Sequence, residues 1–343
     1  MAVAGEPRSD GPAPARRPDE QRMAGPASWP TIVTPDATPR PAEVGAEAIA
    51  RRIAEKSYAC LDVTFEPAHG IVWCMTRADA ASSFSPALLD EILDVQGLIR
   101  AAGATWRSSR GAPVRYFVAG SQQPGVYSLG GDLEFFAGCI RRGDRGGLQR
   151  YARACIEIVH ANFTGLDLPI LTVALIQGDA LGGGFETALS CDIIVAEKSA
   201  KFGLPEILFN LFPGMGALSF LGRRLGIAQA RRLVLSGRIY TAAELHDMGV
   251  IDVVAEDGKG EMALREHLAR LSRKHAVHHA VAAAARHVQP LGFEELRDIN
   301  DIWVETALGL SEADLKRMQV LAEAQVKRRA ARTDGGGMPP AAE

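Results

Sequence analysis

Three features of this 343-residue chain predict an α/β fold. Strand-like and helix-like segments alternate through its first two thirds, and several of the helices are opened by glycine turns. One apolar run, PILTVALI at 169–176, is bounded by turn residues, which is typical of a strand covered on both faces. Alternation of this kind favours strands joined by right-handed helical crossovers.

The elements expected in the first two thirds of the chain follow from periodicity and turn residues. Pro86 to Ala102 carries Leu88, Leu89, Ile92, Leu93 and Ile99 at helical spacing. Short β-rich runs bounded by turn residues predict strands. We expect helices over 46–54, 86–102 and about 148–162, and strands over 60–65, 70–76, 115–119, 169–176 and 192–196.

Beyond Ala217 the pattern becomes helical. Ser311, followed by Asp314 three residues later, is a plausible helix start. The sequence predicts helices over 218–236, 242–248, 261–275, 291–309 and 312–330. The whole chain therefore divides into an α/β core over 44–255 and a C-terminal helical region over 256–332.

The two ends of the chain have a different composition. Residues 1–43 are rich in Pro, Ala, Gly, Arg and Glu and have few aliphatic residues, so they are expected to be a disordered extension. Its arginines leave a transit peptide open as an alternative, but several acids argue against one. Residues 333–343 are expected to form a flexible tail.

Composition narrows the class of protein. The chain is 47% hydrophobic and 23% charged, as in soluble globular proteins, and a net charge of −3 gives no footprint for nucleic acid or anionic membranes. No apolar run approaches the ~18 residues of a membrane span. Five cysteines without a CxxC pair indicate reduced structural thiols. Cytoplasmic localisation is the default expectation.

The chemistry is concentrated in residues 178–216, GDALGGGFETALSCDIIVAEKSAKFGLPEILFNLFPGMG. The triple glycine opens a helix, where free backbone N–H groups can bind a phosphate or the oxyanion of a polarised carbonyl. The stretch is neither a Walker loop nor a complete GxGxxG fingerprint, so a nucleotide site is disfavoured. A second glycine turn, YSLGGDL at 127–133, can supply another N–H group.

Two carboxylates accompany these turns. Glu186 lies in the first turn of its helix, and Glu206 follows Pro205 in GLPEI. Each alone is readily explained as an acid at a helix start. Together, among apolar residues, they suggest an acid/base pair, and burial would raise their pKa values towards the working range.

Other candidates are weaker. The cluster KHAVHH at 274–279 has no acidic ligand at the required spacing, so we favour a solvated helix end over a zinc site. Ser190 is not in a GxSxG elbow, which disfavours a serine hydrolase. Arg223 and Arg224 could contact a carrier's phosphate, although such a pair is usually a solvated face.

In combination, GxxLGGGxE, GxPE, PGxG and an upstream GxD turn resemble the enoyl-CoA hydratase/isomerase (crotonase) superfamily over about residues 60–255. The resemblance implies a spiral of ββα units with a C-terminal helical region, assembled as a homotrimer or hexamer. It also implies that the N–H groups of Gly131 and Gly183 hold a thioester oxygen as an oxyanion hole. Glu186 and Glu206 match the family's two catalytic, water-handling glutamates.

A narrower resemblance, over about residues 57–330, is to the diffusible signal factor synthases. It rests on LGGDL at 129–133, GLPEILFNLFPGMGALSFLGRRL at 203–225 and DIWVETA at 301–307. These bacterial enzymes dehydrate a 3-hydroxyacyl carrier-protein thioester to the cis-2-enoyl form and hydrolyse it to a free fatty acid signal. The resemblance implies an acyl pocket containing Leu181, Gly182 and Trp303, to which we add Phe212 and Met215 as candidates for pocket depth.

The implied partners follow from that chemistry. The substrate would be a thioester of acyl carrier protein phosphopantetheine or of coenzyme A, with no separate cofactor, and a regulatory signalling protein is a further candidate partner. Tyr127 and Ser128 depart from the Phe-Asn expected there, and the N-terminal extension has no counterpart. Two alternatives stay open: a conventional enoyl-CoA hydratase of fatty-acid or polyketide metabolism, and a non-catalytic binding protein.

Overall fold

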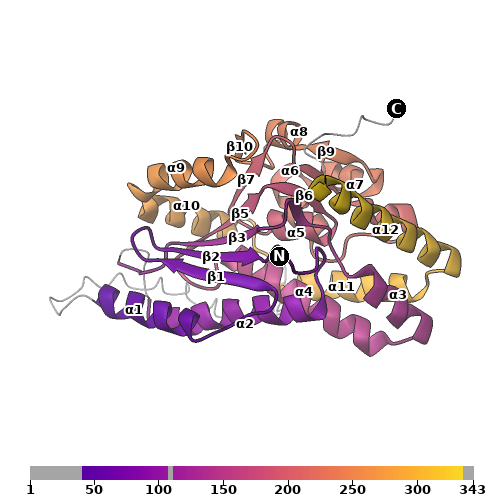
Figure 1. Cartoon of the computed structure of the whole chain (residues 1–343), viewed down its shortest axis with the longest axis horizontal. Coiled ribbons are helices and arrows are strands. Elements are labelled where there is room, and N and C mark those ends of the chain that lie inside the picture. Colours follow the sequence, from indigo (N-terminus) through magenta and orange to yellow (C-terminus); the bar gives the residue numbers. More distant parts are fainter. Residues whose placement is uncertain (1–40, 107–110, 335–343) are drawn as a thin grey trace, which may run out of the picture. The chain divides into compact units, whose positions relative to one another are not determined.

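Two β-sheets carry the fold in the computed structural model, which describes residues 41–106 and 111–334 (Figure 1). The first has the order β1-β2-β3-β5-β7-β10, in which only the β1–β2 pair is antiparallel. The second has the order β4-β6-β8-β9. The strands are β1 (Leu61–Glu66), β2 (Ile71–Thr76), β3 (Tyr116–Ser121), β4 (Gly125–Ser128), β5 (Leu171–Ile176), β6 (Gly178–Leu181), β7 (Ile193–Glu197), β8 (Lys201–Gly203), β9 (Ile239–Thr241) and β10 (Val253–Ala255).

Helices lie between these strands in the sequence and also form the C-terminal part of the chain. Those up to residue 209 are α1 (Pro41–Ala54), α2 (Pro86–Gly103), α3 (Leu133–Arg142), α4 (Arg145–Thr164), α5 (Gly183–Leu189) and the 3₁₀ helix η1 (Pro205–Phe209). Those beyond residue 209 are α6 (Ala217–Leu225), α7 (Ile227–Ser236), α8 (Ala242–Asp247), α9 (Gly260–Ser272), α10 (His275–Val288), α11 (Phe293–Leu308) and α12 (Glu312–Asp334).

The first sheet is covered on both faces, as its apolar strands predict. All six residues of β5 are buried, and successive side chains along it point to opposite faces. On one face, Val173 packs in a cluster with Leu264 and Leu268 of α9. On the other, Ala174 and Ile176 belong to the larger core shared with α2 and α4, and Figure 1 shows the two sets of helices on opposite sides of the sheet.

The predicted α/β class is confirmed, and the predicted strands correspond to β1, β2, β3, β5 and β7. Periodicity gave no signal for β4, β6, β8, β9 and β10, because three or four residues are too few to show alternation. Helix α1 begins at Pro41, five residues before the predicted start. The predicted disordered extension (1–43) and flexible tail (333–343) lie mostly outside the described residues, but residues 41–43 belong to α1 and residues 333–334 to α12.

Two helical predictions were wrong. The helix expected over 218–236 is divided into α6 and α7 at Gly226, whose positive φ of 84° does not continue a right-handed helix. The histidine cluster, interpreted as a solvated helix end, instead opens the 14-residue helix α10, with His275 buried. Its many alanines carry little of the apolar periodicity on which the prediction relied.

A buried ion pair ties α10 to the sheet. Nη2 of Arg286 donates to Asp192 Oδ1 and Oδ2 at 2.6 and 2.8 Å, and only 17% and 15% of the two side chains is exposed. Thr172 also donates to Asp192 through its backbone N–H at 2.9 Å. Burial raises the pKa of Asp192, and Arg286 opposes that shift. The carboxylate, at the start of β7, therefore depends on a cation supplied by the helical region.

Replacing that cation should destabilise the fold. We expect Arg286→Ala to lower the free energy of unfolding by about 3 kcal/mol, since it leaves a buried carboxylate without its partner. Urea denaturation at neutral pH measures this loss. Arg297→Ala, which removes a solvent-exposed pair with Asp298, is the matched control and should change little. Equal losses in the two variants would contradict the structural role of the buried pair.

Candidate active site

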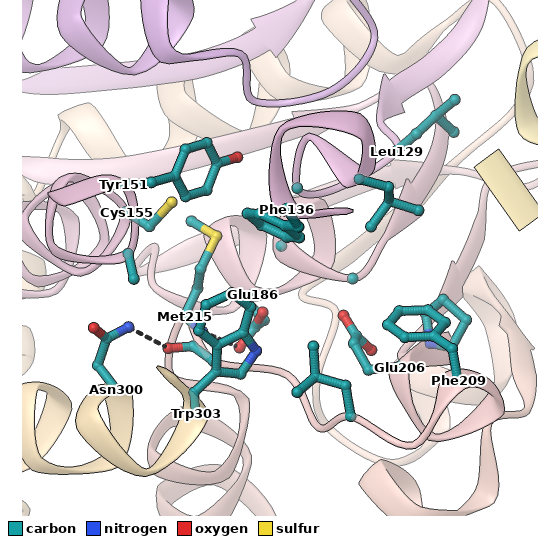
Figure 2. Close-up of a pocket in the computed structure, with 18 of the residues that line it drawn as sticks. Leu129, Phe136, Tyr151, Cys155, Glu186, Glu206, Phe209, Met215, Asn300 and Trp303 are labelled. Carbon is teal, nitrogen blue, oxygen red and sulfur yellow. Dashed lines mark hydrogen bonds between the residues drawn. The ribbon is translucent and has the colours of Figure 1, made fainter. Parts of the chain in front are cut away.

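Gly182 and Gly183 of the triple-glycine turn line a cavity that is partly open to solvent, and Figure 2 shows its larger side chains. Segments far apart in the sequence form it: the β4–α3 turn, α4, the start of α5, η1, the loop before α6, and α11 and α12. The residues that line it are Leu129, Gly131, Leu133, Phe136, Tyr151, Ala152, Cys155, Gly182, Gly183, Glu186, Pro205, Glu206, Phe209, Leu211, Gly214, Met215, Asn300, Trp303 and Leu321.

Glu186 is held rigidly in this cavity. It lies in the first turn of α5 and is only 1% exposed. Its Oε1 accepts hydrogen bonds from the backbone N–H groups of Met215 at 2.8 Å and Ala217 at 2.9 Å. The PGMG segment therefore folds back over α5 and fixes the carboxylate through main-chain donors, which stabilise its charged form.

Glu206 meets different surroundings. It lies in the first turn of η1, and its buried Oε2 has no hydrogen-bond partner among the described residues. Its Oε1 lies against Gly182, where a Cβ would approach to 2.6 Å. Gly182 also has a φ of +52°, so glycine is favoured there both by conformation and by the space that Glu206 occupies. In Figure 2, both acids point into the cavity.

The two acids titrate as a pair. Burial raises the pKa of Glu186 above its ordinary value, and the charge of Glu206 raises it further, whereas backbone hydrogen bonds lower it. Burial also raises the pKa of Glu206. Two nearby carboxylates in an apolar site cannot both ionise easily, so they retain a proton near neutral pH. Glu186 Oε1 accepts two main-chain hydrogen bonds from another segment, which favour its charged form, whereas Glu206 Oε2 accepts none within the described residues.

The two glycines predicted as oxyanion donors lie next to each other in the cavity lining. A Cβ on Gly183 would lie 3.6 Å from the nitrogen of Gly131 and 2.6 Å from the sulfur of Met215. No acceptor is recorded for either N–H group within the described part of the chain. Their neighbours are engaged, since Gly182 N donates to Gly203 O at 2.8 Å and Gly183 O accepts from Thr187 Oγ1 at 2.8 Å. Two unsatisfied donors in one cavity can receive a carbonyl oxygen.

The other predicted pocket residues divide into two groups. Gly182, Met215 and Trp303 line the cavity, with the Trp303 ring edge-on to Phe136 at 5.1 Å. Leu181, the last residue of β6, is buried, and Phe212 is half-buried, but neither is among the lining residues.

Several lining side chains were not predicted from the sequence, namely Phe136, Tyr151, Cys155, Asn300 and Leu321. The spacing of these residues along their helices indicates in part which of them lie together. Tyr151 and Cys155 are four residues apart on α4, and Asn300 and Trp303 are three apart on α11, so each pair shares one helix face. Which faces meet is decided only by tertiary packing.

The remaining candidates are accounted for elsewhere in the fold. Arg223 pairs with Glu295 at 2.7 Å, and Arg224 donates to the backbone oxygen of Cys191 at 2.7 Å. Both arginines are therefore used within the chain. Among residues 41–106 and 111–334, no helix combines the length and apolar character that crossing a membrane requires.

The sequence profile of the enoyl-CoA hydratase/isomerase family matches residues 75–295, a segment that includes both glycine turns and both glutamates. This chain belongs to that family. The match covers well over half of the chain, which confirms the superfamily indicated by the motifs.

Individual relatives match over shorter segments. The mitochondrial methylglutaconyl-CoA hydratase of Rattus norvegicus is 37% identical over 156 residues, 45% of this chain and 47% of that protein. A probable enoyl-CoA hydratase of Rhizobium meliloti (strain 1021) is 47% identical over 93 residues, 27% of this chain and 36% of that protein. The chain thus matches about half or less of the length of these curated relatives.

Solved structures extend the likeness to the whole fold. An enoyl-CoA hydratase from Mycobacterium avium subsp. paratuberculosis K-10 superposes with a TM-score of 0.63 at 21% identity, covering 78% of this chain and 97% of that one. One from Bacillus halodurans gives 0.63 at 24% identity, covering 76% and 100%. The crotonase-type fold with a helical C-terminal region is therefore confirmed.

The raised carboxyl pKa values predict how stability depends on pH. In the window between the ordinary glutamate pKa and the raised values, the folded protein binds more protons than the unfolded chain. Its free energy of unfolding must therefore fall as pH rises through that window. Glu206→Gln removes one of the titrating groups, so it should stabilise the protein relative to wild type at pH 8 and much less at pH 5.

Urea denaturation of both proteins at the two pH values measures this difference. Identical pH slopes for wild type and Glu206→Gln would show that the pair does not retain a proton in the fold.

Proposed function

We propose that this protein is an enzyme that adds or removes water across C2 and C3 of an acyl thioester, in the manner of an enoyl-CoA hydratase. One observation carries the proposal: a buried carboxylate pair and two unsatisfied backbone N–H groups line the same apolar cavity. The N–H groups suit a thioester oxygen, and the carboxylates suit water and a proton. Membership of the family supports the same reaction class.

The arrangement of the site suggests a separate role for the N–H groups and for each glutamate. The N–H groups of Gly131 and Gly183 would hold the thioester oxygen, stabilising the enolate-like charge that develops when C2 gains or loses a proton. In hydration, ionised Glu186 would take a proton from water as the water oxygen bonds to C3, and protonated Glu206 would deliver its proton to C2. Dehydration reverses these transfers: Glu206 removes the C2 proton, and Glu186 protonates the departing C3 hydroxyl.

The walls favour an aliphatic acyl chain. Phe136, Leu211 and Trp303 enclose the space beside the acid pair, and Leu321 of α12 adds to it. The carrier would be coenzyme A or the phosphopantetheine of acyl carrier protein, bound as part of the substrate.

For the physiological direction, we propose dehydration of a 3-hydroxyacyl thioester to its cis-2-enoyl form, followed by hydrolysis to the free cis-2-unsaturated acid, a quorum-sensing signal. The sequence features LGGDL, GLPEILFNLFPGMGALSFLGRRL and DIWVETA support this narrower activity. The location of Trp303 in the cavity wall is consistent with it. Hydrolysis would need the same acid pair to activate water at the carbonyl carbon instead of C3.

Removing either acid should abolish most of the hydration chemistry. Glu186→Gln and Glu206→Gln should each lower kcat/KM for 3-hydroxyacyl-CoA dehydration on the order of 10²-fold or more, the usual scale for a general acid or base. Loss of the enoyl thioester's ultraviolet absorbance in the hydration direction provides a continuous assay.

Glu197→Gln is the matched control, since Glu197 is buried at the end of β7 and does not line the cavity. It should keep nearly full activity. Near-wild-type turnover in both site variants would exclude the proposed chemistry.

The reaction product distinguishes the proposed dehydration and hydrolysis from the activity of a conventional hydratase. Wild-type protein incubated with 3-hydroxyacyl thioesters of several chain lengths, on both carriers, should release free cis-2-enoic acid detectable by mass spectrometry. A conventional hydratase would instead interconvert the 3-hydroxyacyl and trans-2-enoyl thioesters and release no acid. The second result would remove the hydrolytic step and retain the hydratase.

A further inference from the structure

The backbone around Gly131 is pinned on both sides. Before it, Gly130 N donates to Ser128 Oγ at 3.2 Å, and Gly130 O accepts from Phe84 N at 2.8 Å. After it, Asp132 O accepts from Phe136 N at 3.0 Å as α3 begins. Among these neighbouring groups, the N–H of Gly131 is left without a recorded acceptor within residues 41–106 and 111–334. Its direction is thus fixed by the bonds of the residues beside it.

One bond in this set comes from a side chain on another helix. The hydroxyl of Tyr151, on α4, accepts a hydrogen bond from Asp132 N at 3.1 Å and donates its own proton to the carbonyl oxygen of Phe84. Phe84 is the residue that bridges Gly131 in a parallel β-bridge. The Tyr151 hydroxyl oxygen therefore links the two backbone segments, at Phe84 and at Asp132, that lie on either side of the Gly131 N–H group.

The Tyr151 ring is also held in place. It stacks on Phe135 with a centroid separation of 5.2 Å and meets Phe136 edge-on at 4.9 Å. The residue is 5% exposed and lines the cavity, and burial raises the pKa of its hydroxyl, which therefore stays protonated and able to donate. Phenylalanine could fill the same volume, so the packing does not explain why a hydroxyl is present.

We propose that Tyr151 is a positioning residue that aims the Gly131 N–H group at the thioester oxygen. The inference rests on the proposed function, because it requires that Gly131 serve as an oxyanion donor. Tyr151 does not itself contact the thioester oxygen in this scheme. Without its hydroxyl, Asp132 N–H and Phe84 O lose their shared partner, and the Gly131 donor can drift from the direction in which the carbonyl is polarised.

The test measures polarisation of the carbonyl directly. Octanoyl-CoA labelled with ¹³C at the thioester carbonyl is saturated and has no hydroxyl to eliminate, so its bound carbonyl stretch can be recorded by isotope-edited infrared difference spectroscopy. In wild type the stretch should move to lower frequency on binding. In Tyr151→Phe that shift should shrink markedly, and kcat for dehydration should fall on the order of tenfold with KM little changed, because the donor matters most in the transition state.

Two further proteins make the result specific. Tyr127→Phe is the matched control: Tyr127 is buried on β4, four residues before Gly131, but its hydroxyl has no recorded bond within the described residues. It should keep the full carbonyl shift. Replacing the Tyr151 hydroxyl with an amino group, by incorporating 4-aminophenylalanine, restores a group that can both donate and accept, and should restore the shift even if Tyr151→Phe folds poorly.

The outcomes are distinct. A full carbonyl shift in folded Tyr151→Phe would overturn the positioning role while leaving the proposed function intact. The absence of a shift in wild type would overturn both the oxyanion role of Gly131 and this inference. A shift lost in Tyr151→Phe and regained with the amino group would support the proposal.

Discussion

The structure depends on keeping two carboxylates out of water in one apolar cavity. An isolated buried charge costs several kcal/mol, so each acid needs a compensating feature. For Glu186, the compensating feature is a pair of hydrogen bonds that its carboxylate accepts from the backbone N–H groups of Met215 and Ala217. For Glu206, whose Oε2 is unpaired among the described residues, the compensation we propose is a retained proton. One acid would then be stabilised as an anion and the other as a neutral group, which is the arrangement that the proposed water addition requires.

The glycine turns impose a related constraint on the backbone. A buried N–H group without a partner is unfavourable, yet Gly131 and Gly183 each present to the cavity an N–H group that has no acceptor within the described part of the chain. The fold maintains them by engaging the peptide groups on either side, so that neither turn can relax to satisfy its free donor. In both turns a side-chain hydroxyl from a helix, Tyr151 or Thr187, helps to lock the main chain. The free donors are therefore a consequence of rigid surroundings.

The parts of this design that were predictable from the sequence are local. The acid pair and both glycine turns occur in short motifs, and the long buried strands are predicted by their continuous apolar composition. Tyr151, Asn300 and Leu321 were not predictable, because their role depends on α4, α11 and α12 meeting the cavity across more than a hundred residues of chain. Single-sequence periodicity identifies the face of a helix but not its partner. The break at Gly226 was missed for a simpler reason, since glycine within a helical pattern is often tolerated.

The C-terminal helix α11 contacts the loop that holds Glu186. Trp303 packs directly on Gly214, where a Cβ would lie 2.6 Å from the indole ring, and Asn300 donates to Gly214 O at 3.4 Å. The next residue, Met215, supplies an N–H group to Glu186. The loop that fixes Glu186 is thus held between α5 and the cavity wall formed by α11. A substitution that reshapes this wall at Trp303 acts on the same loop, so pocket depth and acid geometry cannot be altered independently.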